Sequence, residues 1–212
     1  IVEDISSDGT PETFHFPVPA QKVEHVIVSL CPTEPWALPN WVILRHKTTA
    51  FLTIKKKKKN SYFSDARFYI AINEKEDRTV ADAKNFACNE DWMSVFPLYA
   101  KYPQDDPVIL TKVILGMDVH FGQDTESLSV LILDAQTVSA MYESLLLRKN
   151  VNSRFIVLSG TGLKENEIIN VQLGTSLEKI LKNKVKEVDR HRVFINGPLR
   201  GREITDLSQK ID

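Results

Sequence analysis

The hydrophobic positions between residues 24 and 149 alternate between short apolar runs and stretches with helical spacing. Four runs are rich in the apolar, aromatic and β-branched residues of strands, at residues 25–30, 68–72, 94–98 and 127–133. After each run, apolar residues recur every three or four positions, as in a helix with one buried side. Repeated strand–helix units predict a mainly parallel sheet packed against helices, an α/β domain.

Two of these helices carry capping signals in the sequence. Asp105, Asp106 and Pro107 place acidic residues and a proline at a helix start, where the N–H that proline lacks has no partner anyway. This helix is expected to end at Gly116. Asp134 is expected to cap the next helix, because it comes directly before a segment with helical spacing.

The pattern changes after residue 150. Strands are expected at 154–159, 167–173 and 192–195, with a helix over 176–184. A hairpin followed by a helix and a strand is typical of a β-grasp module. We therefore expect an N-terminal arm or linker over residues 1–23, an α/β domain over 24–150 and a small α+β, β-grasp domain over 151–212. Because the chain begins at Ile1 rather than methionine, we also expect it to be part of a longer protein.

Composition and charge narrow the functional classes. With 42% hydrophobic and 26% charged residues, the chain is neither disordered nor fibrous. Its net charge of −1 argues against nucleic acid as a partner. No apolar run approaches the roughly 20 residues of a membrane span, so we expect no membrane span of its own.

The usual catalytic and metal-binding motifs are absent from the sequence. There is no nucleophile elbow, no phosphate-binding P-loop and no glycine-rich dinucleotide motif. Two cysteines, Cys31 and Cys88, are too few for an iron–sulfur cluster, and no two histidines have helical metal-ligand spacing. We therefore predict no catalytic residue and no metal site in this chain.

Three local features could instead bind an anion or a partner. Five consecutive lysines at residues 55–59 could meet phosphates or an anionic surface, although a solvated helix end and loop is the favoured explanation. Gly160, Thr161 and Gly162 could let backbone approach an anionic ligand, or could simply form a hairpin turn. Arg200 and Arg202 form a second small basic group that a plain surface turn also explains.

Six short motifs follow one another between residues 101 and 201. They are Lys101-Tyr102-Pro103-Gln104, Leu115-Gly116, Thr137 at a helix start, the strand 154–160, Leu173-Gly174-Thr175 and the glycine-rich segment 195–201. Their order and spacing resemble the C subunit of the Rnf electron-transport complex. They are similar, more weakly, to the A subunit of the sodium-translocating NADH:quinone reductase (Nqr).

The resemblance implies a Rossmann-like flavin domain followed by a soluble-ligand-binding β-grasp (SLBB) domain. It also implies flavin mononucleotide (FMN) and NADH in the first domain, and iron–sulfur clusters held elsewhere in the family. Carried onto this chain, the flavin site would be lined by Glu34, Tyr102 and Asp134. The sequence departs from the family at the residues that bind flavin and NADH. Residues 10–23 contain no glycine where the family has a glycine-rich loop, and Asp105 and Asp106 replace two glycines. The cluster cysteines are missing as well.

These departures lead to one functional hypothesis and two alternatives. The chain would be a docking or ligand-binding subunit of an NADH-linked membrane electron-transfer complex, with a degraded flavin and NADH site. Its partners would be the other subunits, it would lie in the cytoplasm at the inner face of the membrane, and its interaction surface would include Gly160, Thr161, Gly162, Arg200 and Arg202. The alternatives are an active FMN- and NADH-binding oxidoreductase subunit, and a small-ligand-binding β-grasp protein unrelated to redox chemistry.

Overall fold

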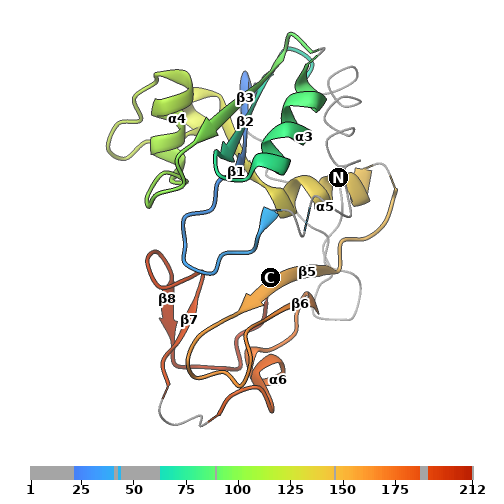
Figure 1. Cartoon of the computed structure of the whole chain (residues 1–212), viewed down its shortest axis with the longest axis vertical. Coiled ribbons are helices and arrows are strands. Elements are labelled where there is room, and N and C mark those ends of the chain that lie inside the picture. Colours follow the sequence, from blue (N-terminus) through green and yellow to red (C-terminus); the bar gives the residue numbers. More distant parts are fainter. Residues whose placement is uncertain are drawn as a thin grey trace. The chain divides into compact units, whose positions relative to one another are not determined.

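The computed structural model describes residues 22–40, 43, 63–88, 90–145, 147–186 and 191–211 (Figure 1). The first part of the described chain contains β1 (His25–Leu30), β2 (Arg67–Asn73), α3 (Asp77–Ala87), β3 (Met93–Leu98), α4 (Pro107–Leu115), a 3-10 turn (Glu126–Leu128), β4 (Val130–Asp134) and α5 (Ala135–Leu145). The second part contains β5 (Ser153–Leu158), β6 (Glu167–Gln172), α6 (Leu177–Leu181), β7 (Val193–Ile195) and β8 (Arg202–Ile204).

The chain divides into two compact units. One comprises Ile1–Pro32 and Asn40–Val151, and the other comprises Thr33–Pro39 and Asn152–Asp212. The second unit therefore includes seven residues that follow β1 in sequence, in addition to the C-terminal part of the chain. That the C-terminal part is an independently folding domain stays a prediction.

The first unit contains a four-stranded sheet in which all pairings are parallel. The strand order is β3-β2-β1-β4, and β1 lies between β2 and β4 with Ile27 opposite Tyr69 and Ile132. The predicted parallel α/β architecture is thus confirmed. Because every strand runs in the same direction, all four carboxyl ends lie at one edge of the sheet.

Helices cover both faces of this sheet, with α4 on one side and α3 and α5 on the other (Figure 1). Alternate residues of a strand point to opposite faces, which allows each face to build its own core. On the α4 side, the buried side chains of Ile27, Ala71, Leu110 and Val130 pack together. On the other side, α5 contributes buried residues such as Val138.

The predicted caps of α4 are confirmed. The carboxylate of Asp106 accepts hydrogen bonds from the backbone nitrogens of Val108 and Ile109, at 2.9 and 3.4 Å. Gly116 adopts a left-handed φ of 73° and its N–H donates to the carbonyl of Lys112, which ends the helix. The hydrogen bonds of this helix therefore follow from its local sequence.

Two predicted element boundaries are wrong. The strand expected at residue 127 begins at Val130, because residues 126–128 form a 3-10 turn that ends in Ser129 with a φ of 60°. The helix expected to reach Lys184 ends at Leu181, and Asn183 has a left-handed φ of 65°. In both cases a left-handed residue interrupts an apolar pattern that continues in the sequence.

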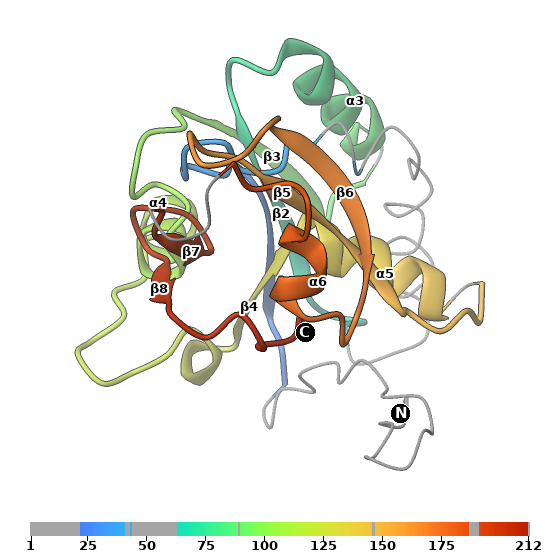
Figure 2. The same ribbon diagram turned by 90° about the horizontal axis from the view of Figure 1, so that it is seen from below.

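The second unit contains two antiparallel pairs and one short helix. Strands β5 and β6 form the predicted hairpin, and α6 lies beside it (Figure 2). Leu177 and Ile180 of α6 are buried together with Val171 of β6 and Ile204 of β8. Strand β8, which pairs with β7, is absent from the sequence-based prediction.

Several sequence-based predictions lie outside the described residues. These are most of the N-terminal arm, the helix predicted after Trp41 and the five lysines at residues 55–59.

Candidate functional site

The carboxyl edge of the parallel sheet gathers polar residues from three successive loops. Cys31 directly follows β1, residues 74–76 follow β2 and residues 99–106 follow β3. Open α/β sheets bind ligands at this edge, so it is the candidate site of the first unit.

The thiol of Cys31 is buried, and carboxylates raise its pKa. Cys31 is fully buried, and burial raises the pKa of its thiol to about 11. The negative charges of Asp105, Glu76 and Glu74, in decreasing order, raise this pKa further. Charges on the loops after β2 and β3 therefore act on the thiol that follows β1, and all three oppose its ionisation.

Two buried polar atoms near this edge have no hydrogen-bond partner within the described part of the chain. They are Oε2 of Glu76, an acceptor, and Nε2 of Gln104, a donor. Buried polar atoms are usually paired, so such atoms mark either a cost to stability or a place where a missing group binds. Sequence reasoning missed Glu76, although its position after a strand of a parallel sheet could have indicated it.

The structure places Tyr102 and Asp134 after different strands of the same sheet. Tyr102 is 43% exposed and lies on the loop after β3, whereas Asp134 ends β4. Strands β3 and β4 are the outer strands of the described sheet. Three strand spacings, or about 14 Å, therefore separate strand β3 from strand β4. The carboxylate of Asp134 is 2.6 Å from the backbone nitrogen of Thr137, where it caps α5. That these residues line a flavin site stays a prediction.

Glu34 belongs to the second unit rather than to the sheet edge. Its carboxylate accepts two backbone hydrogen bonds from the loop between β7 and β8: Oε2 from Leu199 at 3.1 Å and Oε1 from Arg200 at 2.7 Å. The guanidinium of Arg200 also contacts Oγ1 of Thr33, at 3.4 Å. Glu34, which was expected beside Tyr102 and Asp134, is therefore hydrogen-bonded to the β7–β8 loop. This loop contains Arg200, which the sequence analysis named as part of a basic group.

Arg202 and the Gly160–Gly162 segment make contacts of their own within the second unit. Arg202 donates to Oε1 of Gln209 at 3.3 Å. The N–H of Gly160 donates to Oδ1 of Asn166 at 3.0 Å. The ammonium of Lys186 donates to the carbonyl of Thr161 at 3.1 Å, and the backbone N–H of Lys186 donates to the carbonyl of Gly162 at 2.9 Å. The segment lies in the connection between the antiparallel strands β5 and β6, and its carbonyls are bound by Lys186. A ligand role for the segment stays a prediction.

The described residues provide little of what FMN or an iron–sulfur cluster needs. None of the eight glycines lies in segments 31–39, 74–76 or 99–106, which link the strands of the sheet to the next elements, so side chains limit close approach of a phosphate to backbone there. The carboxylates around Cys31 also repel a phosphate. Cys31 is buried and Cys88 is exposed, and no group of three or more potential metal ligands occurs in the described ranges.

Taken together, the fold and these residues define a Rossmann-like α/β unit with an acidic carboxyl edge, joined to a small unit of antiparallel strands. Among solved structures, the chain is similar in fold to a chain of an NAD+-reducing NiFe-hydrogenase in the air-oxidized state, with a TM-score of 0.62 and 12% identity. The match covers 91% of this chain and 38% of that chain.

Comparison with curated proteins shows which proteins are related to the chain. It is 24% identical over 193 residues to the C subunit of an ion-translocating oxidoreductase complex from Haemophilus influenzae (strain PittEE), covering 90% of this chain and 29% of that protein. It is 28% identical over 143 residues to the protein of the same name from Actinobacillus succinogenes, covering 67% of this chain and 20% of that protein. No protein-family model matches. The resemblance to the Rnf C subunit is thus confirmed, and the chain spans less than a third of the length of these relatives.

Within the described residues, no helix has both the length and the apolar character required to cross a bilayer.

Proposed function

We propose that this chain is a docking or ligand-binding component of an NADH-linked ion-translocating oxidoreductase complex, and that its Rossmann-like unit does not hold FMN or NADH. Other subunits of that complex would be its partners, at the inner face of the cell membrane. The similarity of this chain to the C subunits of such complexes supports its assignment to one of them. Iron–sulfur clusters would be held outside this chain.

The observation that carries the proposal is the cluster of carboxylates around Cys31. A flavin phosphate binds where backbone N–H groups and positive charge converge. Here Glu74, Glu76 and Asp105 all raise the pKa of the Cys31 thiol, which supports a site that disfavours an anion. The phosphate of a cofactor at this edge would be repelled by these carboxylates.

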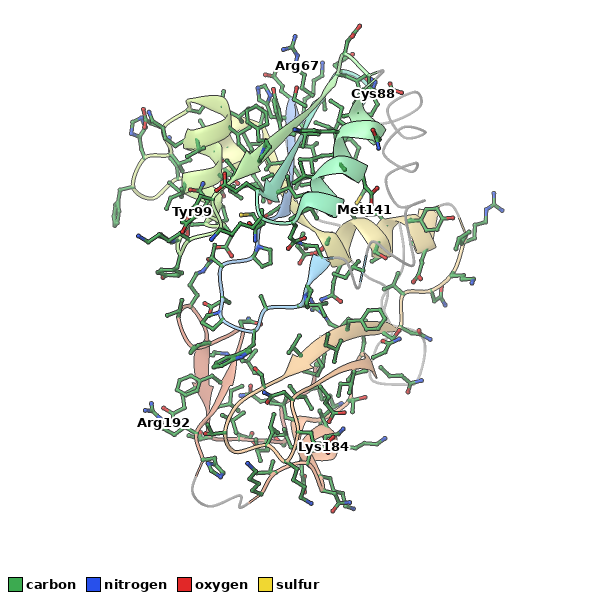
Figure 3. All side chains as sticks on the ribbon, in the orientation of Figure 1. Arg67, Cys88, Tyr99, Met141, Lys184 and Arg192 are labelled. Atoms are coloured by element: carbon green, nitrogen blue, oxygen red, sulfur yellow. The ribbon has the colours of Figure 1, made fainter. Side chains whose placement is uncertain are left out.

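A docking role is supported by apolar side chains exposed on the first unit. Tyr99, labelled in Figure 3, is 54% exposed on the loop after β3, and Val113 on α4 is 50% exposed. Tyr102, Val108 and Phe121 are exposed within the same stretch of chain. Contiguous exposed apolar patches mark protein–protein interaction sites, and we propose these side chains as part of such a surface.

The visible absorption spectrum of the purified chain tests the proposal, before and after excess FMN is added and the unbound fraction removed. We expect no retained flavin band. A retained band at one flavin per chain would overturn the proposal and favour an active oxidoreductase subunit.

Paired variants test the physical cause. Glu76→Gln combined with Asp105→Asn removes two carboxylates from the neighbourhood of Cys31. The matched control, Asp82→Asn combined with Asp91→Asn, removes two exposed carboxylates from α3 and the turn before β3. If negative charge excludes the flavin, weak FMN binding appears only in the first pair. Equal behaviour of both pairs would show that the carboxylates near Cys31 do not decide flavin binding.

A further inference from the structure

The loop between β7 and β8 holds one carboxylate with one backbone N–H for each oxygen. Leu199 donates to Oε2 of Glu34 and Arg200 donates to Oε1, so both oxygens are bound by neighbouring residues of one turn. Hydrogen bonds to an ionised carboxylate are stronger than those between neutral groups. The spacing of these two N–H groups therefore matches the two oxygens of a carboxylate.

Space for the carboxylate exists because residue 197 has no side chain. A Cβ at Gly197 would lie 2.3 Å from Oε2 of Glu34, far inside van der Waals contact. Gly197 also has a φ of 89°, a backbone conformation that other residues rarely adopt. Glycine at this position thus both shapes the turn and leaves room for the bound group.

The turn is closed by bonds that do not involve Glu34. The N–H of Gly201 donates to the carbonyl of Gly197 at 3.1 Å, and β7 and β8 pair on either side. A Cβ at Gly201 would lie 2.0 Å from the carbonyl oxygen of Ile195, so the backbone is tightly packed there. The two N–H groups are therefore expected to keep their geometry when Glu34 leaves.

Glu34 reaches this turn from a distant part of the chain. It comes from a segment 165 residues away from Leu199 in sequence, and both of its hydrogen bonds are exposed to solvent. An external carboxylate can reach the same N–H groups once Glu34 moves away. The guanidinium of Arg200 lies on the same turn and adds a positive charge that favours an anion.

We propose that the turn over residues 197–201 is a carboxylate-binding site, and that Glu34 is an internal ligand that an external carboxylate replaces. This rests on the proposed function to the extent that the chain is a docking or ligand-binding component. The external carboxylate comes either from a small carboxylic acid or from an acidic side chain of a partner. In both cases it occupies the position of the Glu34 carboxylate.

The test follows the backbone amide signals of Leu199 and Arg200 by NMR in the full chain. The variant Glu34→Gln removes the internal carboxylate, and its amide nitrogen is a donor that faces one of the two N–H groups. One probe is acetyl-Pro-Thr-Glu-Pro-amide, which has the sequence of residues 32–35. The matched control probe contains Gln in place of Glu, and sodium acetate at constant ionic strength represents a small carboxylic acid.

In Glu34→Gln, the Glu peptide is expected to shift both amide signals saturably, and the Gln peptide is not. In the unmodified chain, the tethered carboxylate competes, so binding of the Glu peptide is expected to weaken by roughly tenfold or more. Saturation by acetate as strong as that by the peptide would identify a small carboxylic acid as sufficient. Glu165→Gln, which removes an exposed carboxylate elsewhere in the second unit, should behave like the unmodified chain.

Equal shifts with the Glu and Gln peptides, or no shift at these two amides in a folded Glu34→Gln chain, would overturn the proposal. If Glu34→Gln does not fold, the unmodified chain decides. The Glu peptide must then shift the Leu199 and Arg200 amides at high concentration while the Gln peptide does not. Because these signals report only on the second unit, the result is separate from whether the first unit retains flavin.

Discussion

The carboxylate of Asp134 lies 2.6 Å from the backbone nitrogen of Thr137, three residues further along the chain. This contact occupies one oxygen of a residue that the family resemblance assigns to a flavin site. It satisfies an N–H at the start of α5 that has no partner within the helix. Asp134 therefore has a structural role that is independent of any cofactor.

Replacing Asp134 by alanine is expected to lower the free energy of unfolding by about 1 kcal/mol, the usual effect of losing an N-cap. Asp134→Asn should change it little, because asparagine caps helices about as well as aspartate does. Urea unfolding followed by circular dichroism measures both variants. An asparagine variant as unstable as the alanine variant would show that the charge, and not the cap, is what matters.

Gly116→Ala is expected to destabilise the first unit through backbone conformation alone. Gly116 has a φ of 73°, and a Cβ there would meet nothing within 4 Å, so no clash contributes. Alanine in a left-handed conformation costs about 1–2 kcal/mol. Gly116→Asn should cost clearly less, because asparagine tolerates this conformation. Thermal unfolding of both variants checks the order, and a loss as large for asparagine would contradict it.

The two sides of α4 should respond very differently to truncation. Leu110 is fully buried between the helix and the sheet, so Leu110→Ala is expected to cost about 2–5 kcal/mol. Val113, on the same helix, is 50% exposed, and Val113→Ala should change the free energy of unfolding by about 0.5 kcal/mol or less. Denaturant unfolding of the two variants measures the contrast, which would vanish if this face of the sheet were not packed as described.

The stability of the first unit should fall at alkaline pH. Burial, together with nearby carboxylates, raises the pKa of the Cys31 thiol from its ordinary value of 9.0 to about 11. Between these values the unfolded chain releases a proton that the folded chain retains, so the free energy of unfolding decreases as pH rises from 9 towards 11. Unfolding measured across this range should show the decrease.

Cys31→Ala is the control for this prediction and should flatten the pH dependence. Thiol alkylation gives a second measurement, because the thiolate is the reactive form. In the folded chain near neutral pH, exposed Cys88 should react and buried Cys31 should not, whereas both should react after unfolding. Rapid modification of Cys31 in the folded chain would contradict its assigned environment.

Much of the first unit was predictable because its signals are local. The runs that form β1, β2 and β3 are short, and Asp106 and Gly116 make their capping bonds within four residues. The start of β4 was misplaced because Ser129 takes a left-handed conformation inside a continuous apolar pattern. A pattern of polarity does not encode the sign of φ at such a residue.

The candidate site was predictable only in part. Asp134 and Tyr102 were identified from motifs, and the structure places them after different strands of one sheet. The buried, unpartnered atoms of Glu76 and Gln104 could be recognised only in the structure, because burial and hydrogen bonding depend on the surrounding residues. Residue type and spacing carry no information about burial of a single oxygen or nitrogen.

The sequence by itself determined the alternation of strands and helices in the first unit, its parallel α/β class, the caps of α4 and the resemblance to the Rnf C subunit. These depend on hydrogen bonds and apolar periodicities that span a few residues, or on motifs read in order. Only the tertiary structure decided that Cys31 is buried and that the charges of Glu74, Glu76 and Asp105 raise the pKa of its thiol. It also decided that Glu34, three residues after Cys31, bonds to Leu199 and Arg200 in the second unit. Such contacts join segments far apart in the chain, and they form where packing and electrostatics bring those segments together.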